Sequence, residues 1–172
     1  MEPWRRLDEA DEGLARALLR ACCGSTRWVD AMTARRPFGD RPTLQAAARY
    51  IWFALDEEDW REAFSHHPKI GDRESLRRRF AATRHLSERE QQGVDGAAEA
   101  VLAELADANS RYERTFGYIF IVRASGRTAE EMLALLRARL DNDPHTEIRI
   151  AAAQQAEITA LRLDAIELKA DS

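Results

Sequence analysis

Apolar residues recur every three to four positions along most of this 172-residue chain, the spacing of helices that bury one face. The pattern predicts helices over residues 8–22, 44–55, 57–64, 73–84, 96–116, 128–140 and 145–168. The candidate helix N-caps are Ser25, Thr43, Asp56, Ser87 and Thr128. The chain is therefore predicted to be all-α, a single compact helical bundle of about eight to nine helices forming one domain over residues 1–172.

One segment departs from the helical period. Residues 117–122, GYIFIV, form a continuous apolar run that has the composition of a strand. The rest of the sequence offers no second strand to pair with it, and an isolated strand is not stable. We expect a buried extended stretch or the irregular start of a helix.

The composition of the chain limits the classes of protein to which it can belong. The chain has 45% hydrophobic and 33% charged residues with a net charge of −4, which is typical of soluble globular proteins and argues against a nucleic-acid-binding surface. The basic residues 73–80 are best explained as a solvated helix face. No secretory signal or membrane-spanning run is visible. Cys22 and Cys23 are adjacent, so they do not have the C-x-x-C spacing of zinc or redox sites, and we expect both to be small buried side chains in a reducing compartment. Together these features predict a cytoplasmic protein without a membrane partner.

The sequence HHPKIGD places two histidines before a proline. The ring of Pro68 biases His67 towards extended backbone, which favours a loop from which the imidazole can reach a pocket. Histidine is suited to proton transfer near neutral pH. His67 could equally be a surface loop histidine or a core histidine bound to a backbone carbonyl, and His66 is of the same type.

A second polar block runs from Ser87 to Gln91. Ser87 and Glu90 fit a capping box, which explains both residues without any function. A helix N-terminus also offers free amides to an anionic ligand, and Gln91 adds a donor and an acceptor that capping does not use. The two interpretations are compatible.

Arg162 falls within the predicted apolar arc of the last helix. That arc comprises Ile148, Ala151, Ile158, Leu161, Ala165 and Ile166. An inward-facing guanidinium needs a partner, either a core carboxylate or a carboxylate-bearing ligand, and spacing alone does not choose between them. The four histidines lack metal-ligand spacing.

Taken in order, several segments resemble a known family. The segments STRWV, HHPKIGD, LSEREQQGV, FGYIFIV, ASGRTAEEML, RLDNDPHTE and EITALRL resemble the 2-oxo-4-hydroxy-4-carboxy-5-ureidoimidazoline (OHCU) decarboxylases of urate degradation. The resemblance runs from about Leu7 to Leu168. It implies an all-helical enzyme, commonly a homodimer, that produces (S)-allantoin from OHCU without a metal or organic cofactor.

The resemblance also implies a set of site residues. The catalytic residues would be His67, which handles the proton, and Glu90, which orients it or binds the ureido group. The substrate-binding residues would be Pro68, Ser87, Glu88, Arg89, Glu90, Gln91, Phe120, Ile121, Val122, Arg123, Ala124 and Arg162. Substrate would meet the main chain of residues 120–124.

One position departs from the family pattern. Arg123 stands where a small residue, often cysteine, is expected. If residues 120–124 bind through the backbone, its side chain can face away. Two other functions stay open: a related lyase acting on another ureido or imidazoline acid, and a non-catalytic helical ligand-binding module.

Overall fold

Helices supply all of the regular structure in the described residues, which are 1–68, 76–78 and 88–166 in this computed structural model. Side chains are described outside 88–97. No strand occurs in these ranges, so the all-α prediction is confirmed there. None of the described helices combines the length and hydropathy that a bilayer crossing requires.

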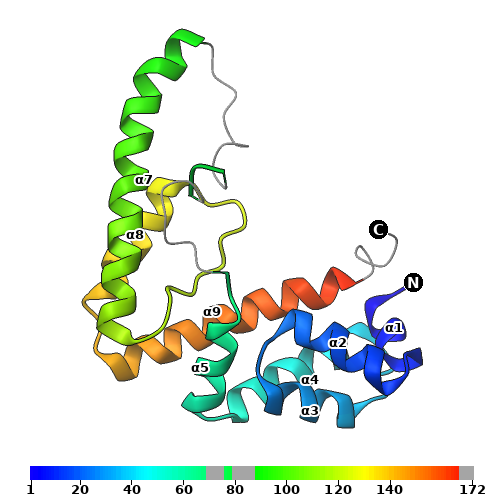
Figure 1. Cartoon of the computed structure of the whole chain (residues 1–172). Coiled ribbons are helices and arrows are strands. Elements are labelled where there is room, and N and C mark those ends of the chain that lie inside the picture. Colours follow the sequence, from blue (N-terminus) through cyan, green and yellow to red (C-terminus); the bar gives the residue numbers. More distant parts are fainter. Residues whose placement is uncertain (69–75, 79–87, 167–172) are drawn as a thin grey trace. The chain divides into compact units, whose positions relative to one another are not determined.

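The chain divides into two compact units, each described here on its own (Figure 1). The first contains Met1–His67, Ile121–Arg123 and Ile148–Ser172, and the second contains Pro68–Phe120 and Ala124–Glu147. The prediction of a single domain over residues 1–172 stays a prediction.

The first unit is built from five N-terminal helices and most of the last one. These are α1 (Pro3–Glu9), α2 (Glu12–Cys22), α3 (Thr26–Arg35), α4 (Arg41–Ala54), α5 (Glu57–Ser65) and α9 (Pro144–Asp164), coloured from blue through cyan to orange-red in Figure 1. Helix α3 packs against α2, α4 and α5, and α1 packs against α2 and α4.

Two indole rings tie the core of this unit together. Trp28 Nε1 donates to the Ala48 carbonyl at 3.1 Å, and Trp52 Nε1 donates to the Ala152 carbonyl at 2.8 Å. Both rings are fully buried, so each satisfies its one polar atom while its apolar surface fills the core. The second bond joins α4 to α9 across 100 residues of sequence.

Three predicted caps are confirmed. The side chains of Ser25, Asp56 and Thr128 each accept a hydrogen bond from the amide three residues later, at 3.1–3.3 Å. Each satisfies one of the amides that a helix start leaves without an intrahelical acceptor.

The predicted cap at Thr43 is wrong. Helix α4 begins at Arg41, and its N-cap is Asp40, whose carboxylate accepts from the Thr43 amide at 2.7 Å. Pro42 lies in the first turn, where its fixed φ suits a helix and its missing amide hydrogen costs nothing. A charged acceptor three residues earlier therefore starts the helix before Thr43.

The second unit is centred on two helices that pack together, α7 (Glu88–Phe116) and α8 (Ala129–Leu140). The predicted helix over 96–116 and the separate start after Ser87 form one continuous 29-residue helix, because residues 88–116 contain no proline to interrupt it. Of the predicted helix over 73–84, residues 76–78 are helical and the others lie outside the described residues.

Helix α9 begins at Pro144, one residue earlier than predicted. Asp143 caps it, with Oδ1 accepting from the Thr146 amide at 3.0 Å, and Pro144 takes the first helical position instead of acting as a breaker. The helix ends at Asp164, short of the predicted Leu168, which itself lies outside the described residues.

A buried polar cluster joins α7, α8 and the first turn of α9. Glu147 is fully buried and accepts from Arg139 Nε at 2.7 Å, from Asn142 Nδ2 at 2.9 Å and from the Tyr112 hydroxyl. Burial and the bond to Glu147 raise the pKa of Tyr112 far above its usual range. The arginine charge therefore has a compensating anion, as a buried guanidinium requires.

Between α7 and α8, residues 117–122 form neither a helix nor a strand, and the expected extended backbone stays a prediction. Gly117 has φ +84° and donates its amide to the Glu113 carbonyl at 2.8 Å, which is a left-handed helix end. Tyr118 and Ile121 are buried, so the apolar run reflects burial and not sheet pairing.

Candidate functional site

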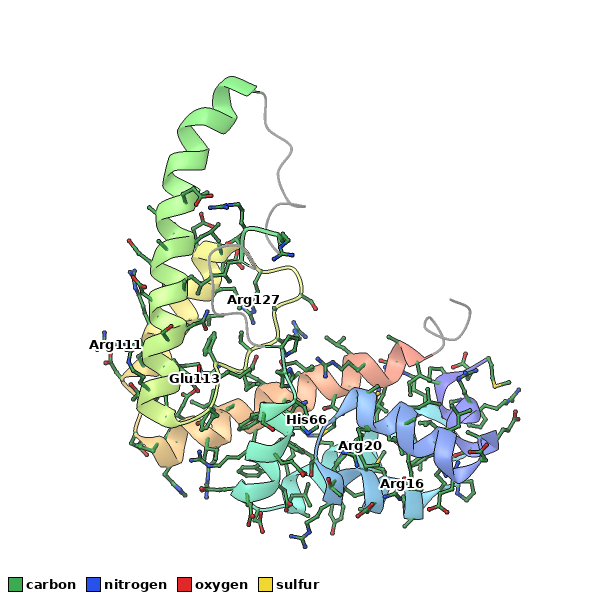
Figure 2. The ribbon with its side chains drawn as sticks, viewed as in Figure 1. Arg16, Arg20, His66, Arg111, Glu113 and Arg127 are labelled. Carbon is green, nitrogen blue, oxygen red and sulfur yellow. The ribbon has the colours of Figure 1, made fainter. Side chains whose placement is uncertain are left out.

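His66 and His67 end α5 in two different environments. His66 is the C-cap, and its ring lies so close to Gly24 that a Cβ there would come within 2.5 Å of its Cγ. Figure 2 labels His66 in the first unit. The His67 amide donates to the Phe64 carbonyl at 3.2 Å, and its ring is half-buried. The two histidines, equivalent in sequence type, therefore differ in their contacts.

The His67 ring contacts a buried amide on α9. Its Nε2 is hydrogen-bonded to Oε1 of Gln155, a side chain with only 1% of its surface exposed. Gln155 Nε2 donates to Thr159 Oγ1 at 3.0 Å, and Thr159 Oγ1 donates to the Cys22 carbonyl at 3.4 Å. The His67 ring is therefore bonded to a buried side-chain amide, where the sequence alternatives were a surface position or a bond to a backbone carbonyl.

The surroundings of His67 favour its neutral form. Burial lowers its pKa below the ordinary value of 6.5, and the positive charge of Arg162 lowers it further. The hydrogen bond to Gln155 acts in the opposite direction, but burial is the largest cause. Near neutral pH the ring is therefore uncharged and can accept a proton.

Arg162 lies on the same side of α9 as Gln155 and Thr159, although the predicted apolar arc of this helix was partly wrong. Leu161, assigned to that arc, is 45% exposed. The buried positions of the helix are Glu147, Ile148, Ala151, Ala152, Gln155, Ala156, Thr159 and Leu163. Arg162 follows Gln155 by seven residues and Thr159 by three, so it borders the buried face and is half-buried.

The Cys23 thiol lies beside the same residues. Burial raises its pKa to about 11, against opposing effects of the Ser25 amide, the Thr159 hydroxyl and the Arg162 charge. The thiol therefore stays protonated at neutral pH. Cys22 and Cys23 are both buried and free, as the sequence predicts.

The stretch Ile121–Arg123, which is neither helix nor strand, is hydrogen-bonded to a glutamine of α9. The Arg123 amide donates to Gln154 Oε1 at 2.9 Å, while the Arg123 side chain is exposed. Gln154 and Gln155 thus hold two segments that the resemblance assigns to the site. The orientation of Arg123 suits backbone binding by this stretch, and its role in binding stays a prediction.

The other predicted site residues are described in the second unit or lie outside the described residues. Phe120 packs under the Arg139 guanidinium, 4.5 Å from ring centroid to Cζ, and Ala124 is half-buried. Pro68 is exposed. Ser87 lies outside the described residues, and four others are described only as backbone at the start of α7: Glu88, Arg89, Glu90 and Gln91. The pairing of His67 with Glu90 therefore stays a prediction.

Sequence reasoning missed Gln154, Gln155 and Thr159. A signal for two of them was present: Gln155 and Thr159 are four residues apart on a helix, in line with the apolar positions of its buried face. A buried amide and hydroxyl at that spacing need partners, which points to a polar group on the facing element. Among the described residues, no three His, Cys, Asp or Glu side chains gather into a metal-binding group.

The all-α fold agrees with comparisons to known proteins. The family model for OHCU decarboxylase matches residues 8–164, and the chain belongs to this family. The all-α fold is also that of a crystal structure of OHCU decarboxylase in the presence of (S)-allantoin. That structure is 36% identical and superposes with a TM-score of 0.70 over 94% of this chain and all of the other.

Two sequence relatives come from distant organisms. The uric acid degradation bifunctional protein TTL of Arabidopsis thaliana is 42% identical over 147 residues, which cover 84% of this chain and 44% of the relative. The 2-oxo-4-hydroxy-4-carboxy-5-ureidoimidazoline decarboxylase of Amia calva is 27% identical over 136 residues, 79% of this chain and 77% of the relative. The chain thus spans less than half the length of its plant relative.

Proposed function

We propose that this protein is a decarboxylase that converts OHCU to (S)-allantoin. The observation that carries the proposal is the half-buried His67, held on Gln155 beside Arg162 in a chain of the OHCU decarboxylase family. The pKa of His67 is lowered, so a neutral imidazole is available near neutral pH to exchange a proton.

The name of the substrate gives the bonds that change. Its carboxyl group and a hydroxyl share carbon 4, next to the ureido-bearing carbon 5. When CO2 leaves, the electron pair of the broken bond forms a double bond between carbons 4 and 5. The π pair of the ring carbon–nitrogen double bond moves onto the nitrogen, which takes a proton, and an enol results. A proton then adds to carbon 5, and the hydroxyl of carbon 4 loses its proton to become a carbonyl.

In this reaction the protein must hold the substrate, stabilise charge and deliver one proton to one face. We assign the proton transfer to His67. Arg162 would bind an anionic or carbonyl edge of the substrate. Glu90 would orient His67 or bind the ureido group. Amides of residues 120–124, with Pro68 and residues 87–91, would complete the binding surface.

Circular dichroism tests this proposal. Urate treated with urate oxidase and hydroxyisourate hydrolase supplies OHCU, whose spontaneous decay gives racemic allantoin. A signal of the S enantiomer that grows only with this protein is the expected result. A flat trace with folded protein would reject the decarboxylase and favour a related ureido-acid lyase or a binding module.

A histidine pair tests the role of His67. His67→Ala should reduce the rate about 10²–10⁴-fold, the usual contribution of a positioned acid or base. His145→Ala, at an exposed position of α9, is the matched control and should keep full activity. Full activity in folded His67→Ala would contradict the assignment.

We further propose that the protein is a cytoplasmic homodimer that takes OHCU as its small-molecule partner. The resemblance to the family supports the dimer, and the two free buried cysteines are compatible with a reducing compartment. Light scattering after size exclusion should give twice the chain mass of 19.6 kDa. A mass of 19.6 kDa at micromolar concentration would contradict the dimer.

A further inference from the structure

We propose that Gln155 and Thr159 form a relay that fixes the tautomer of His67, with the ring proton on Nε2. Nδ1 is then the nitrogen that exchanges a proton with the substrate. Gln155 is a positioning residue in this scheme, because it acts through His67. The part concerning substrate rests on the proposed function, whereas the tautomer itself does not.

The donor and acceptor roles along the relay are fixed at one end by a backbone carbonyl. The Cys22 oxygen can only accept, so the Thr159 hydroxyl donates its single hydrogen away from Gln155, in the 3.4 Å bond to that oxygen, with the Cys23 sulfur as a second acceptor beside it. The Thr159 oxygen is then an acceptor towards Gln155, 3.0 Å away. Gln155 must therefore turn its NH2 group to Thr159.

That orientation determines what His67 meets. With its nitrogen on Thr159, Gln155 presents Oε1 to His67 Nε2. An amide oxygen carries no hydrogen, so the bond forms only if Nε2 is protonated. In the neutral ring the other nitrogen, Nδ1, is then the basic one.

Burial makes this orientation difficult to reverse. Gln155 is 1% exposed and Thr159 is 5% exposed, so water has little access to replace a lost partner. An amide turned the other way would face Nε2 with its NH2 group and leave the Thr159 hydrogen shared between two acceptors. A buried polar group without its partner is costly, so the observed direction is favoured.

Other titratable groups surround the ring. Arg162 faces it from α9, and His66 precedes it on its own segment. Cys23, on the segment after α2, contacts Thr159, and Glu62 of α5 acts on the Cys23 thiol. The Arg162 charge disfavours the imidazolium, while the Gln155 oxygen stabilises it. The relay therefore determines which ring nitrogen of His67 titrates, whereas burial and the Arg162 charge lower its pKa.

Nitrogen-15 NMR of the imidazole rings, without substrate, tests the tautomer directly. Above the His67 pKa, the wild-type Nε2 should carry the proton and Nδ1 should not. Thr159→Val removes the hydroxyl that orients Gln155, so the two tautomers should both be populated. Thr33→Val is the matched control, because Thr33 donates within α3 to the Val29 carbonyl, and its His67 spectrum should match wild type.

Two outcomes of that experiment would overturn the relay. One is a wild-type His67 that carries its proton on Nδ1. The other is a folded Thr159→Val protein whose tautomer is the same as in wild type. Neither outcome depends on whether the protein has decarboxylase activity.

Kinetics of two Gln155 variants add the functional readout. Gln155→Leu removes the acceptor, so kcat should fall about tenfold or more while KM changes little, because proton transfer and not binding loses its geometry. Gln155→Glu keeps an acceptor and should restore part of kcat. Its negative charge stabilises the imidazolium, so the acid limb of the kcat profile should move to higher pH.

A result that contradicts the relay can be distinguished from a result that contradicts the proposed decarboxylase function. Unchanged kcat in folded Gln155→Leu would overturn the positioning role, with the wild-type enzyme still active. A wild-type protein that has the Nε2 tautomer but makes no (S)-allantoin would reject the decarboxylase and leave the relay in place.

Discussion

At the scale of single residues, two buried polar arrangements differ in charge. In the second unit Arg139 and Glu147 form an ion pair closed by neutral donors, so every charge has a partner. In the first unit His67 is uncharged near neutral pH and rests on an amide. The ion pair suits a stabilising role in the core, whereas the uncharged His67 ring can still gain a proton.

The Arg139–Glu147 pair should be sensitive to the loss of one partner. Arg139→Met leaves Glu147 buried without its cation, so the free energy of unfolding should fall by about 3–5 kcal/mol. The control is Arg137→Met, whose exposed pair with Glu104 should change stability by less than about 1 kcal/mol. Urea unfolding measures both. Equal effects of the two substitutions would contradict a special role for the buried pair.

The lowered pKa of His67 predicts a pH window for stability. Because burial holds the folded pKa below 6.5, the unfolded chain binds the proton more tightly. The stability that neutral His67 permits is present above pH 6.5 and is lost as pH falls from there through the folded pKa. The difference in unfolding free energy between wild type and His67→Gln should be constant from pH 7.5 to 9 and decrease below 6.5. A flat difference across this window would contradict the shift.

At the scale of elements, helix starts are decided by short-range acceptors, and sequence reasoning found three of them. Ser25, Asp56 and Thr128 were identifiable because a cap and the amide it satisfies are three residues apart. Thr43 misled because Asp40 and Pro42 start the same helix slightly earlier. When two possible capping residues lie within one turn, the backbone geometry decides which of them caps the helix, and residue type alone does not predict that choice.

The cap of α8 offers a test at this scale. Thr128→Ala should lower the free energy of unfolding by about 1 kcal/mol, because the Glu131 amide loses its acceptor. Thr115→Ala, which removes a hydroxyl bonded to the Arg111 carbonyl inside α7, should change it by less, since alanine has the higher helix propensity. Thermal unfolding compares them, and a larger loss for Thr115→Ala would contradict the assignment.

At the scale of the whole chain, the first unit is assembled from three segments distant in sequence. Its core contacts, such as the bond from Trp52 to Ala152, connect residues that no local pattern relates. The candidate site has the same origin, because His67, Thr159 and the Cys22 carbonyl come from three different parts of the chain.

One of these long-range contacts can be tested by a conservative substitution. Trp52→Phe keeps an aromatic ring but removes the hydrogen bond to the Ala152 carbonyl and leaves a partly empty space, so stability should fall by about 1–3 kcal/mol. Trp4→Phe, at a half-buried position, is the control and should cost less than about 0.5 kcal/mol. Denaturant unfolding followed by circular dichroism checks both. Equal midpoints would show that the Ala152 bond contributes little.

By itself, the sequence determined the all-α class, most helix segments, three caps and the burial of both cysteines. These properties depend on residues within a turn or two of each other, so periodicity and side-chain type suffice. Local patterns also indicated His67 and Arg162 as candidates, and the resemblance of ordered motifs added the family and the roles it implies for them. Only the tertiary structure decided that Leu161 is exposed, that His66 packs on Gly24 and that Gln155 holds His67. A hydrogen bond between residues 67 and 155 depends on how distant helices pack, and no local pattern encodes that packing.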